Sequence, residues 1–223
     1  MILSCENLNK IYQNNNTSIV EHVLKNINLN IEKGVLAALR GPSGSGKSTL
    51  LNLIAGLDYP SSGKVTFNNI IVNNLNNSEL AIYRNKNIGI IFQFFNLLND
   101  LTVYENIALP LIIRGENRKQ ISTKVLPLIE KIGLMNRKDF KTNILSGGES
   151  QRVAIARSLI TEPKLILADE PTGNLDKSNT DMILDLLIDS CKSTNSALLM
   201  VTHDIDLLKK FDKVYTLESG IIS

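Results

Sequence analysis

The sequence Gly41-Pro42-Ser43-Gly44-Ser45-Gly46-Lys47-Ser48-Thr49 fits the pattern G-x-x-x-x-G-K-[ST]. An apolar run of strand length, 35–39, comes before it, and residues 50–55 have the composition of a helix. A glycine loop between a strand and a helix is the setting in which this pattern binds phosphate. A chance glycine-rich turn would not explain both flanking elements. We therefore predict a nucleotide-binding loop at 41–49.

Each part of this loop has a physical role in holding a triphosphate. Glycine has no Cβ, so the backbone can close around the phosphates, and the N–H groups at the start of the helix attract anions. Lys47 adds a positive charge for the β- and γ-phosphates, and Ser48 offers a hydroxyl to Mg²⁺. The predicted ligand is therefore ATP or GTP with Mg²⁺.

The composition is that of an ordinary globular protein, with 43% hydrophobic and 21% charged residues in a chain of 223. The net charge of +2 does not indicate a nucleic-acid or other acidic partner. Cys5 and Cys191 lie far apart in the sequence, so we predict reduced, buried thiols and no disulfide or metal site. We find no signal peptide, and no apolar run approaches the roughly 20 residues of a membrane span. A membrane role would therefore require a partner chain.

The pattern of apolar residues predicts an α/β domain. Ile27, Leu29 and Ile31 alternate with polar residues, which favours half-exposed antiparallel strands within 1–34. Later strands are predicted at 64–67, 87–92, 164–168, 197–202 and 213–218, and an amphipathic helix at 182–188. Because strands and helices alternate, we expect a mostly parallel sheet with right-handed crossovers.

The middle of the chain has a different character. Val125, Ile129 and Ile132 recur at helical spacing, and Pro110 and Gly115 interrupt the segment. We predict one domain over 1–223. Residues 1–93 and 161–223 would form its core with an antiparallel β-subdomain, and 94–160 would form an inserted helical subdomain.

Two carboxylates follow the apolar run at 165–168. A central strand would deliver Asp169 to the same sheet edge as the phosphate loop, where it can hold Mg²⁺ directly or through water. Glu170 comes next and can polarise an attacking water. The alternative is a strand that ends in an acidic turn, but the upstream phosphate loop favours the functional interpretation.

A second glycine-containing helix start lies at Ser146-Gly147-Gly148-Glu149, directly after Leu145. The same physics makes it a possible anion site, with the Ser146 hydroxyl as a donor. The alternative is a simple capping box formed by Ser146 and Glu149. One chain rarely needs two anion sites for one nucleotide, so this segment poses a question that the residues alone leave open.

The phosphate loop, the LSGGE sequence at 145–149, the segment 165–170 and His203 together resemble the ATP-binding cassette ATPases in order and spacing. The resemblance covers essentially the whole chain. It implies a phosphate-loop NTPase fold with a RecA-like, mostly parallel sheet, an N-terminal antiparallel β-subdomain and a helical signature subdomain. It also implies a head-to-tail homodimer that hydrolyses ATP with Mg²⁺. Residues 146–149 of each chain would contact the nucleotide bound by the other.

The resemblance also implies individual roles. Glu170 would be the catalytic base, and His203 would be the switch histidine that contacts the γ-phosphate. Gln93 matches the glutamine that senses Mg²⁺ and links the core to the helical subdomain. Ser48, Gln93 and Asp169 would then be the metal ligands.

Two further positions match nucleotide-site residues of the family. Tyr12 matches the aromatic residue that stacks on adenine, although simple strand packing is the alternative. Asp176 belongs to a loop, 174–176, that reports across the dimer.

Within the family, segments 92–98, 101–111 and 168–176 are most similar to the lipoprotein-releasing and macrolide-export ATPases. This similarity implies peripheral attachment to the cytoplasmic face of the inner cell membrane through integral membrane permease subunits, and no nucleic-acid partner. A division-associated regulatory ATPase and an export ATPase remain alternatives. Phe94 and Phe95 would either enter the core or line the groove for the membrane subunit, and we expect one of each.

Overall fold

The computed structural model describes residues 1–13, 20–173 and 177–223. Within these residues the strands form two sheets. The first is antiparallel, with the strand order β2-β1-β4-β5. Its strands are β1 (Leu3–Gln13), β2 (Val20–Ile31), β4 (Ser62–Phe67) and β5 (Ile70–Ile71). The antiparallel strands predicted within 1–34 are thereby confirmed.

The second sheet has the order β10-β9-β3-β8-β7-β6, and all its neighbouring strands are parallel except β9 and β10. Its strands are β3 (Leu36–Arg40), β6 (Ile88–Ile91), β7 (Leu165–Asp169), β8 (Ala197–Val201), β9 (Lys213–Glu218) and β10 (Ile221–Ile222). This is the mostly parallel sheet that the alternation of strands and helices predicts.

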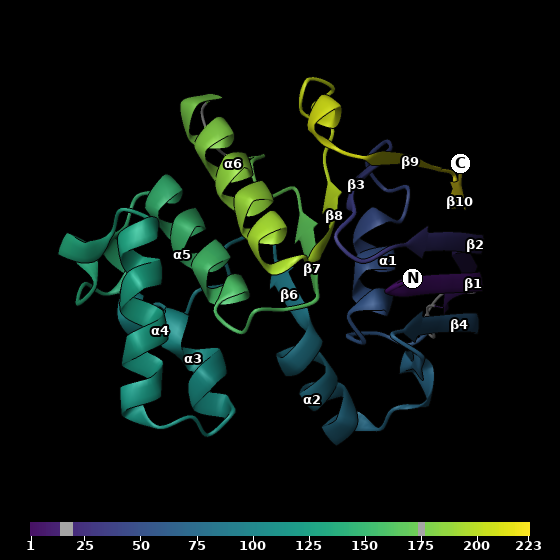
Figure 1. Cartoon of the computed structure of the whole chain (residues 1–223). Coiled ribbons are helices and arrows are strands. Elements are labelled where there is room, and N and C mark those ends of the chain that lie inside the picture. Colours follow the sequence, from purple (N-terminus) through teal and green to yellow (C-terminus); the bar gives the residue numbers. More distant parts are fainter. Residues whose placement is uncertain (14–19, 174–176) are drawn as a thin grey trace.

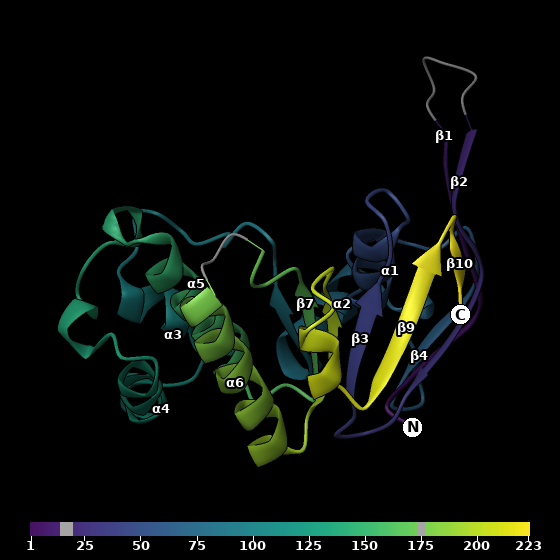
Figure 2. The ribbon, with the colours of Figure 1, turned by 90° about the horizontal axis from the view of Figure 1, so that it is seen from above.

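The helices divide into groups by position. The antiparallel sheet lies on one side of the molecule and α3, α4 and α5 on the other, with α6 between them (Figures 1 and 2). The α-helices are α1 (Lys47–Ile54), α2 (Asn77–Asn87), α3 (Val103–Ile113), α4 (Arg118–Lys131), α5 (Gly147–Leu159) and α6 (Lys177–Thr194). Short 3₁₀ helices span Val72–Asn74, Met135–Arg137, Thr142–Ile144 and Leu207–Lys210.

Both faces of the parallel sheet are buried. On β7, Leu165 and Leu167 face a hydrophobic cluster shared with α1 and the antiparallel sheet. Ile166 and Ala168 face a second cluster, which α6 covers. Successive side chains of a strand point to opposite faces, so a sheet that is covered on both sides requires continuous apolar runs. This explains why the central strands could be recognised in the sequence.

A third hydrophobic cluster joins α3, α4 and α5, with Val103, Ile129 and Val153 fully buried. It contains the apolar residues whose helical spacing indicated an insertion. The domain boundaries proposed from the sequence, 93/94 and 160/161, remain predictions.

Two local features differ from the sequence-based expectation. Helix α2 was not predicted, because it is strongly polar and buries just Leu80 and Tyr83; a capping box between Asn76 and Glu79 fixes its start. Pro110 does not interrupt the helical segment, since it lies inside α3. The chain turns instead at Gly115, whose φ of 77° is easily adopted by glycine.

Candidate nucleotide-binding site

The phosphate loop leaves the end of β3 and enters α1 at Lys47. Gly44 and Gly46 have φ values of 75° and 102°, a region that residues with a Cβ rarely adopt. A Cβ on Gly46 would also lie 2.8 Å from Leu24 Cδ2. Glycine is therefore required at position 46 both by its backbone conformation and by the close approach of β2.

The start of α1 is built to receive an anion. Its N-cap, Gly46, provides no side-chain acceptor, and its first turn contains no acidic residue. By contrast, α2, α3, α4 and α5 all begin with capping boxes. The first N–H groups of a helix need partners, and here no side chain caps them. The buried Ser45 Oγ in the same loop also lacks a hydrogen-bond partner in the structure. A phosphate chain fits these donors.

The Lys47 ammonium is buried and held across the loop. Its Nζ donates to the carbonyl oxygens of Gly41, at 2.9 Å, and Pro42, at 2.8 Å. These neutral acceptors keep the charge close to the loop backbone. A phosphate oxygen would bind the ammonium more strongly, because it carries a negative charge that a carbonyl oxygen lacks.

Asp169, at the end of β7, faces the phosphate loop. Burial raises the pKa of its carboxyl, a hydrogen bond with the Ser48 side chain opposes this, the nearby Glu170 charge raises the pKa further, and Lys47 lowers it. A carboxylate and a hydroxyl in contact provide the oxygen ligands that Mg²⁺ uses, and Mg²⁺ takes its remaining ligands from water and phosphates. The residues present therefore fit a magnesium ion bound together with a nucleotide.

The predicted catalytic residues meet beside this carboxylate. Glu170 follows β7 with a φ of 46°, and its Oε2 lies 3.6 Å from Nδ1 of His203, which follows β8. Gln93 follows β6 and, with these two residues, lines a cavity of about 550 Å³ over the phosphate loop. We call the nucleotide-site residues of one chain, without 146–149, a half-site. Most of the predicted half-site lines this phosphate-loop cavity: Tyr12, Gly41, Ser43, Gly44, Gly46, Lys47, Ser48, Thr49, Gln93, Asp169, Glu170 and His203. Pro42 and Ser45 belong to the same loop, but they are not among the described residues that line the cavity.

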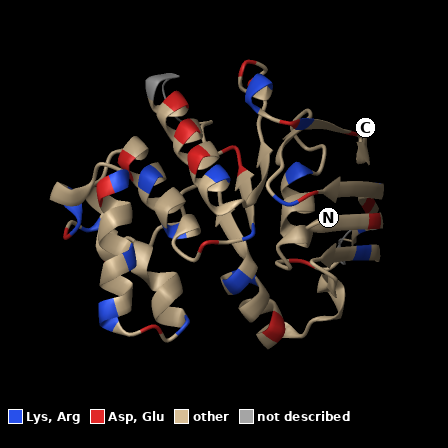
Figure 3. Cartoon of the chain, in the orientation of Figure 1, with Lys and Arg blue, Asp and Glu red and all other residues tan. Residues whose placement is uncertain are grey.

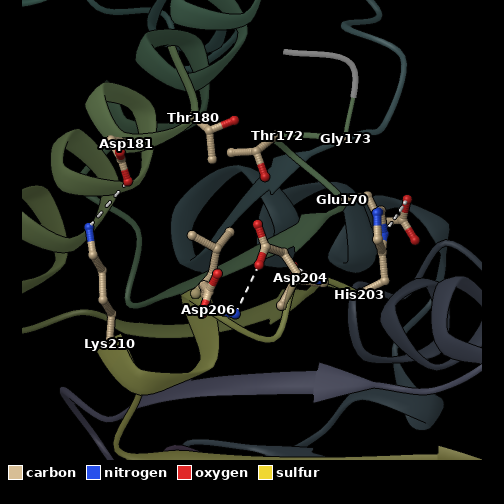
Figure 4. Close-up of a pocket in the computed structure, with 11 residues that line it drawn as sticks. Glu170, Thr172, Gly173, Thr180, Asp181, His203, Asp204, Asp206 and Lys210 are labelled. Carbon is tan, nitrogen blue, oxygen red and sulfur yellow. Dashed lines mark hydrogen bonds and ion pairs between the residues drawn. The ribbon is translucent and has the colours of Figure 1, made fainter. Parts of the chain in front are cut away.

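Glu170 and His203 also form one end of a second cavity of about 500 Å³, which extends toward Asp181 on α6 and Asp206 (Figure 4). The pair therefore separates the phosphate-loop cavity from a polar opening beside α6. The Glu170 carboxylate is therefore also open to solvent from this side, with 24% of its side chain exposed.

The segment 146–149 lies away from the phosphate loop of its own chain. It begins α5, which lies on the opposite side of α6 from α1 (Figures 1 and 2). The capping box that the sequence offered as an alternative is present. Ser146 Oγ donates to Glu149 Oε2 at 2.9 Å, and Glu149 N–H donates to Ser146 Oγ at 3.3 Å. Gly147 and Gly148 follow within the first turn of the helix.

Tyr12 is placed at the rim of the phosphate-loop cavity, where it is 42% exposed. Its hydroxyl donates to Asp58 Oδ2 at 2.8 Å. The ring is therefore not enclosed by strand packing and is accessible from the cavity, and its contact with adenine stays a prediction. Asp176 lies outside the described residues.

The sequence did not predict the residues that contact Tyr12 and the segment after Gln93. Lys10 and Asp58 contact Tyr12, and Arg157 on α5 donates to the carbonyl oxygens of Phe95 and Asn96 at 3.0 and 2.7 Å. Lys10 and Tyr12 are two positions apart on one strand, so their shared face could have been inferred. The contacts of Asp58 and Arg157 join distant segments and have no local signal.

The fold and this half-site define a class, the phosphate-loop NTPases. The model of the ABC transporter family matches residues 24–173, so the chain belongs to that family and is an ABC-type ATPase. It is 46% identical to the lipoprotein-releasing system ATP-binding protein LolD of Pseudoalteromonas translucida, over 99% of this chain and 94% of that protein. It is 44% identical to LolD of Legionella pneumophila, over 99% and 96%.

Solved structures give the same result. The chain is similar to the ATP-binding cassette MJ0796, whose dimeric post-hydrolysis state bound to ADP and Pi has been solved. The two sequences are 38% identical, and the structures superpose with a TM-score of 0.93 over 100% of this chain and 97% of that chain. CbiO1 from Clostridium perfringens is 33% identical, with a TM-score of 0.86 over 100% and 86%. Among the described residues, none of the helices combines the length and apolarity that a membrane span needs.

Proposed function

We propose that the chain is the ATP-hydrolysing subunit of a membrane complex that releases lipoproteins from the inner membrane toward the outer membrane. The proposal of ATP hydrolysis rests on one observation. Residues from distant parts of the sequence line one cavity, namely Lys47, Ser48, Asp169, Glu170 and His203. Support for lipoprotein release comes from relatives named LolD that match over nearly the full chain.

In this proposal the triphosphate of ATP binds across residues 41–49, and Lys47 exchanges its carbonyl partners for phosphate oxygens. Ser48, Gln93 and Asp169 would hold Mg²⁺, which offsets negative charge on the phosphates. Glu170 accepts a proton from the attacking water, and His203 contacts the γ-phosphate. The 3.6 Å separation of Glu170 from His203 allows both residues to reach one reacting group.

We further propose that two chains pair head to tail. Within one chain, the phosphate loop and residues 146–149 lie on opposite sides of α6, so 146–149 cannot contact the nucleotide bound by the same chain. In a head-to-tail pair they would contact the nucleotide bound by the partner chain. The N-terminus of α5 would then contribute its N–H groups and the Ser146 hydroxyl to the γ-phosphate. The dimeric state of the MJ0796 cassette supports this arrangement.

The permease would bind a groove between α2, α3 and the end of α5. The groove has a volume of about 470 Å³, and its lining is mainly apolar, including Leu57, Phe92 and Ile113. Ile113 is 69% exposed there. Phe94 is 72% exposed and Phe95 is half-buried, but neither is among the described residues that line this groove. The assignment of one ring to the core and one to the groove therefore stays a prediction.

Integral membrane subunits of the LolC/LolE type are the proposed occupants of the groove, which would place the chain peripherally on the cytoplasmic face of the inner membrane. We propose no nucleic-acid partner. Basic and acidic residues are interspersed along the described part of the chain, with several acidic residues on α6 (Figure 3). The net charge of +2 also lacks the strongly basic character that is typical of proteins that bind a phosphate backbone.

The proposal is tested by purifying the tagged chain from membranes, identifying the bound permease and measuring lipoprotein release in vesicles that contain the complex. Ile113→Glu should abolish permease binding and permease-stimulated hydrolysis while leaving hydrolysis by the isolated chain unchanged. Ile221→Glu is the matched control, because Ile221 is similarly exposed, at 57%, but lies on β10, away from the groove. A permease complex that hydrolyses ATP without releasing lipoproteins would contradict the proposal and favour a regulatory or export ATPase.

A further inference from the structure

A compact group of polar side chains lies behind Tyr12. Asp58, which follows α1, accepts hydrogen bonds at both carboxylate oxygens. Lys10 Nζ donates to Oδ1 at 2.7 Å, and the Tyr12 hydroxyl donates to Oδ2 at 2.8 Å. Lys10 Nζ also donates to the carbonyl oxygen of Tyr59 at 2.7 Å. One carboxylate therefore fixes a buried ammonium and an aromatic hydroxyl relative to each other.

The same lysine contacts the tyrosine ring. Lys10 is 8% exposed, and its Nζ lies over the Tyr12 ring, 4.6 Å from the centroid. A cation at this distance attracts the ring through its negative face. The ring is thus held at its hydroxyl by Asp58 and over its face by Lys10. Tyr12 also lines the phosphate-loop cavity.

The pKa shifts of Asp58 and Tyr12 keep the hydrogen bond between them in place around neutral pH. Burial opposes ionisation of Asp58, but the hydrogen bonds from Lys10, Tyr12 and the Tyr59 N–H outweigh it, so the pKa of Asp58 lies below its usual value. Burial, the hydrogen bond to Asp58 and its charge raise the pKa of Tyr12, and a hydrogen bond with Thr49 opposes them. Asp58 thus stays an acceptor and Tyr12 a donor.

We propose that Lys10 and Asp58 are positioning residues that hold the Tyr12 ring ready to stack on the base of the nucleotide, and so set the affinity for the base. This inference rests on the proposed ATP site. A free tyrosine side chain must be ordered when a ligand stacks on it, whereas a ring held in advance avoids that cost. Loss of the hold should weaken binding of a purine nucleotide about three- to tenfold and should not alter binding of the phosphates.

The test compares two ligands by calorimetry on the full chain: the non-hydrolysable analogue AMPPNP with Mg²⁺, and inorganic tripolyphosphate, which has no base. For Asp58→Asn we expect a three- to tenfold weaker AMPPNP affinity, unchanged tripolyphosphate affinity, and a higher KM for ATP with unchanged kcat. An AMPPNP affinity within twofold of the wild type would overturn the proposal. An equal loss for both ligands would overturn it too, because it would show a general distortion of the loop.

Asp58→Asn leaves the buried Lys10 ammonium without its counter-ion, which can prevent folding. Tyr12→Phe is therefore the second variant, since it keeps the ring and removes just the hydroxyl. It should show the same selective loss of AMPPNP affinity, and no such loss would contradict the inference. Lys47→Ala separates this inference from the proposed function: if that variant binds AMPPNP as tightly as the wild type does, the nucleotide site itself is wrong.

Discussion

Ser146 caps α5, and a substitution can separate this cap from the role that we propose for Ser146 in the dimer. In the unliganded chain it caps α5: its Oγ accepts from the Glu149 N–H and donates to the Glu149 carboxylate. Ser146→Ala should therefore reduce the free energy of unfolding by about 1 kcal/mol, the usual value of an N-cap. In a domain of this size that corresponds to a melting temperature lower by about 2–4 °C.

The second role is in the proposed dimer, where the Ser146 hydroxyl would donate to the γ-phosphate bound by the partner chain. Removing one donor to charge that develops in a transition state lowers kcat by roughly 100- to 1,000-fold, far more than the loss of the cap explains. The assay measures steady-state ATP hydrolysis together with thermal unfolding. Hydrolysis by Ser146→Ala within threefold of the wild type would refute the role in the partner's site.

A matched variant shows which role is lost. Aspartate caps helices as well as serine does and its charge is favourable at a helix N-terminus, but it repels phosphate. The aspartate can accept from the Glu149 N–H but cannot donate to the Glu149 carboxylate, so Ser146→Asp should recover part of the lost melting temperature without recovering hydrolysis. Recovery of both would show that Ser146 acts just as a cap.

Two further variants test the loop and its carboxylate. Position 46 has a φ of 102°, and a Cβ there would contact Leu24. Gly46→Ala should therefore abolish nucleotide binding and lower the free energy of unfolding, measured in urea, by about 1–3 kcal/mol. Gly44→Ala is the control and should lose less stability, because a Cβ there meets nothing within 4 Å. Asp169→Asn should raise the melting temperature of the unliganded chain at pH 7. The folded-state pKa of Asp169 is raised, chiefly by burial, so its ionisation costs stability as pH rises above the unfolded value of about 3.9. The difference should therefore vanish below about pH 4, and a lower melting temperature at pH 7 would contradict this reasoning.

The sequence predicted those elements whose signals are local. The central strands are continuous apolar runs because both faces of the sheet are buried, and the loop at 41–49 is a contiguous glycine pattern. Asp169 could be placed beside the phosphate loop because β3 and β7 are parallel strands whose ends share one edge, whereas His203 was assigned to the site from the family resemblance. Helix α2 could not be predicted from periodicity, since most of its residues are polar and exposed.

The residues that contact the site residues from distant parts of the chain could not be predicted from local sequence patterns. Asp58 contacts Lys10 across 48 positions in the sequence, and Arg157 reaches Phe95 across 62. Neither contact follows from spacing along one element, because each depends on how β1, α1 and α5 pack in three dimensions. The resemblance to ABC ATPases identified residues that would touch the nucleotide, whereas the structure identified those that hold them in place.

In the proposed cycle two half-sites close around ATP, and hydrolysis by a water that Glu170 activates reopens them. Glu170→Gln tests it directly, by size-exclusion chromatography with light scattering in ATP and Mg²⁺ together with single-turnover hydrolysis. We expect the variant to form a stable ATP-bound dimer with intact ATP binding and almost no hydrolysis, while the wild type hydrolyses its ATP and returns to monomers. Hydrolysis near the wild-type rate, or a variant that binds ATP and stays monomeric, would contradict it.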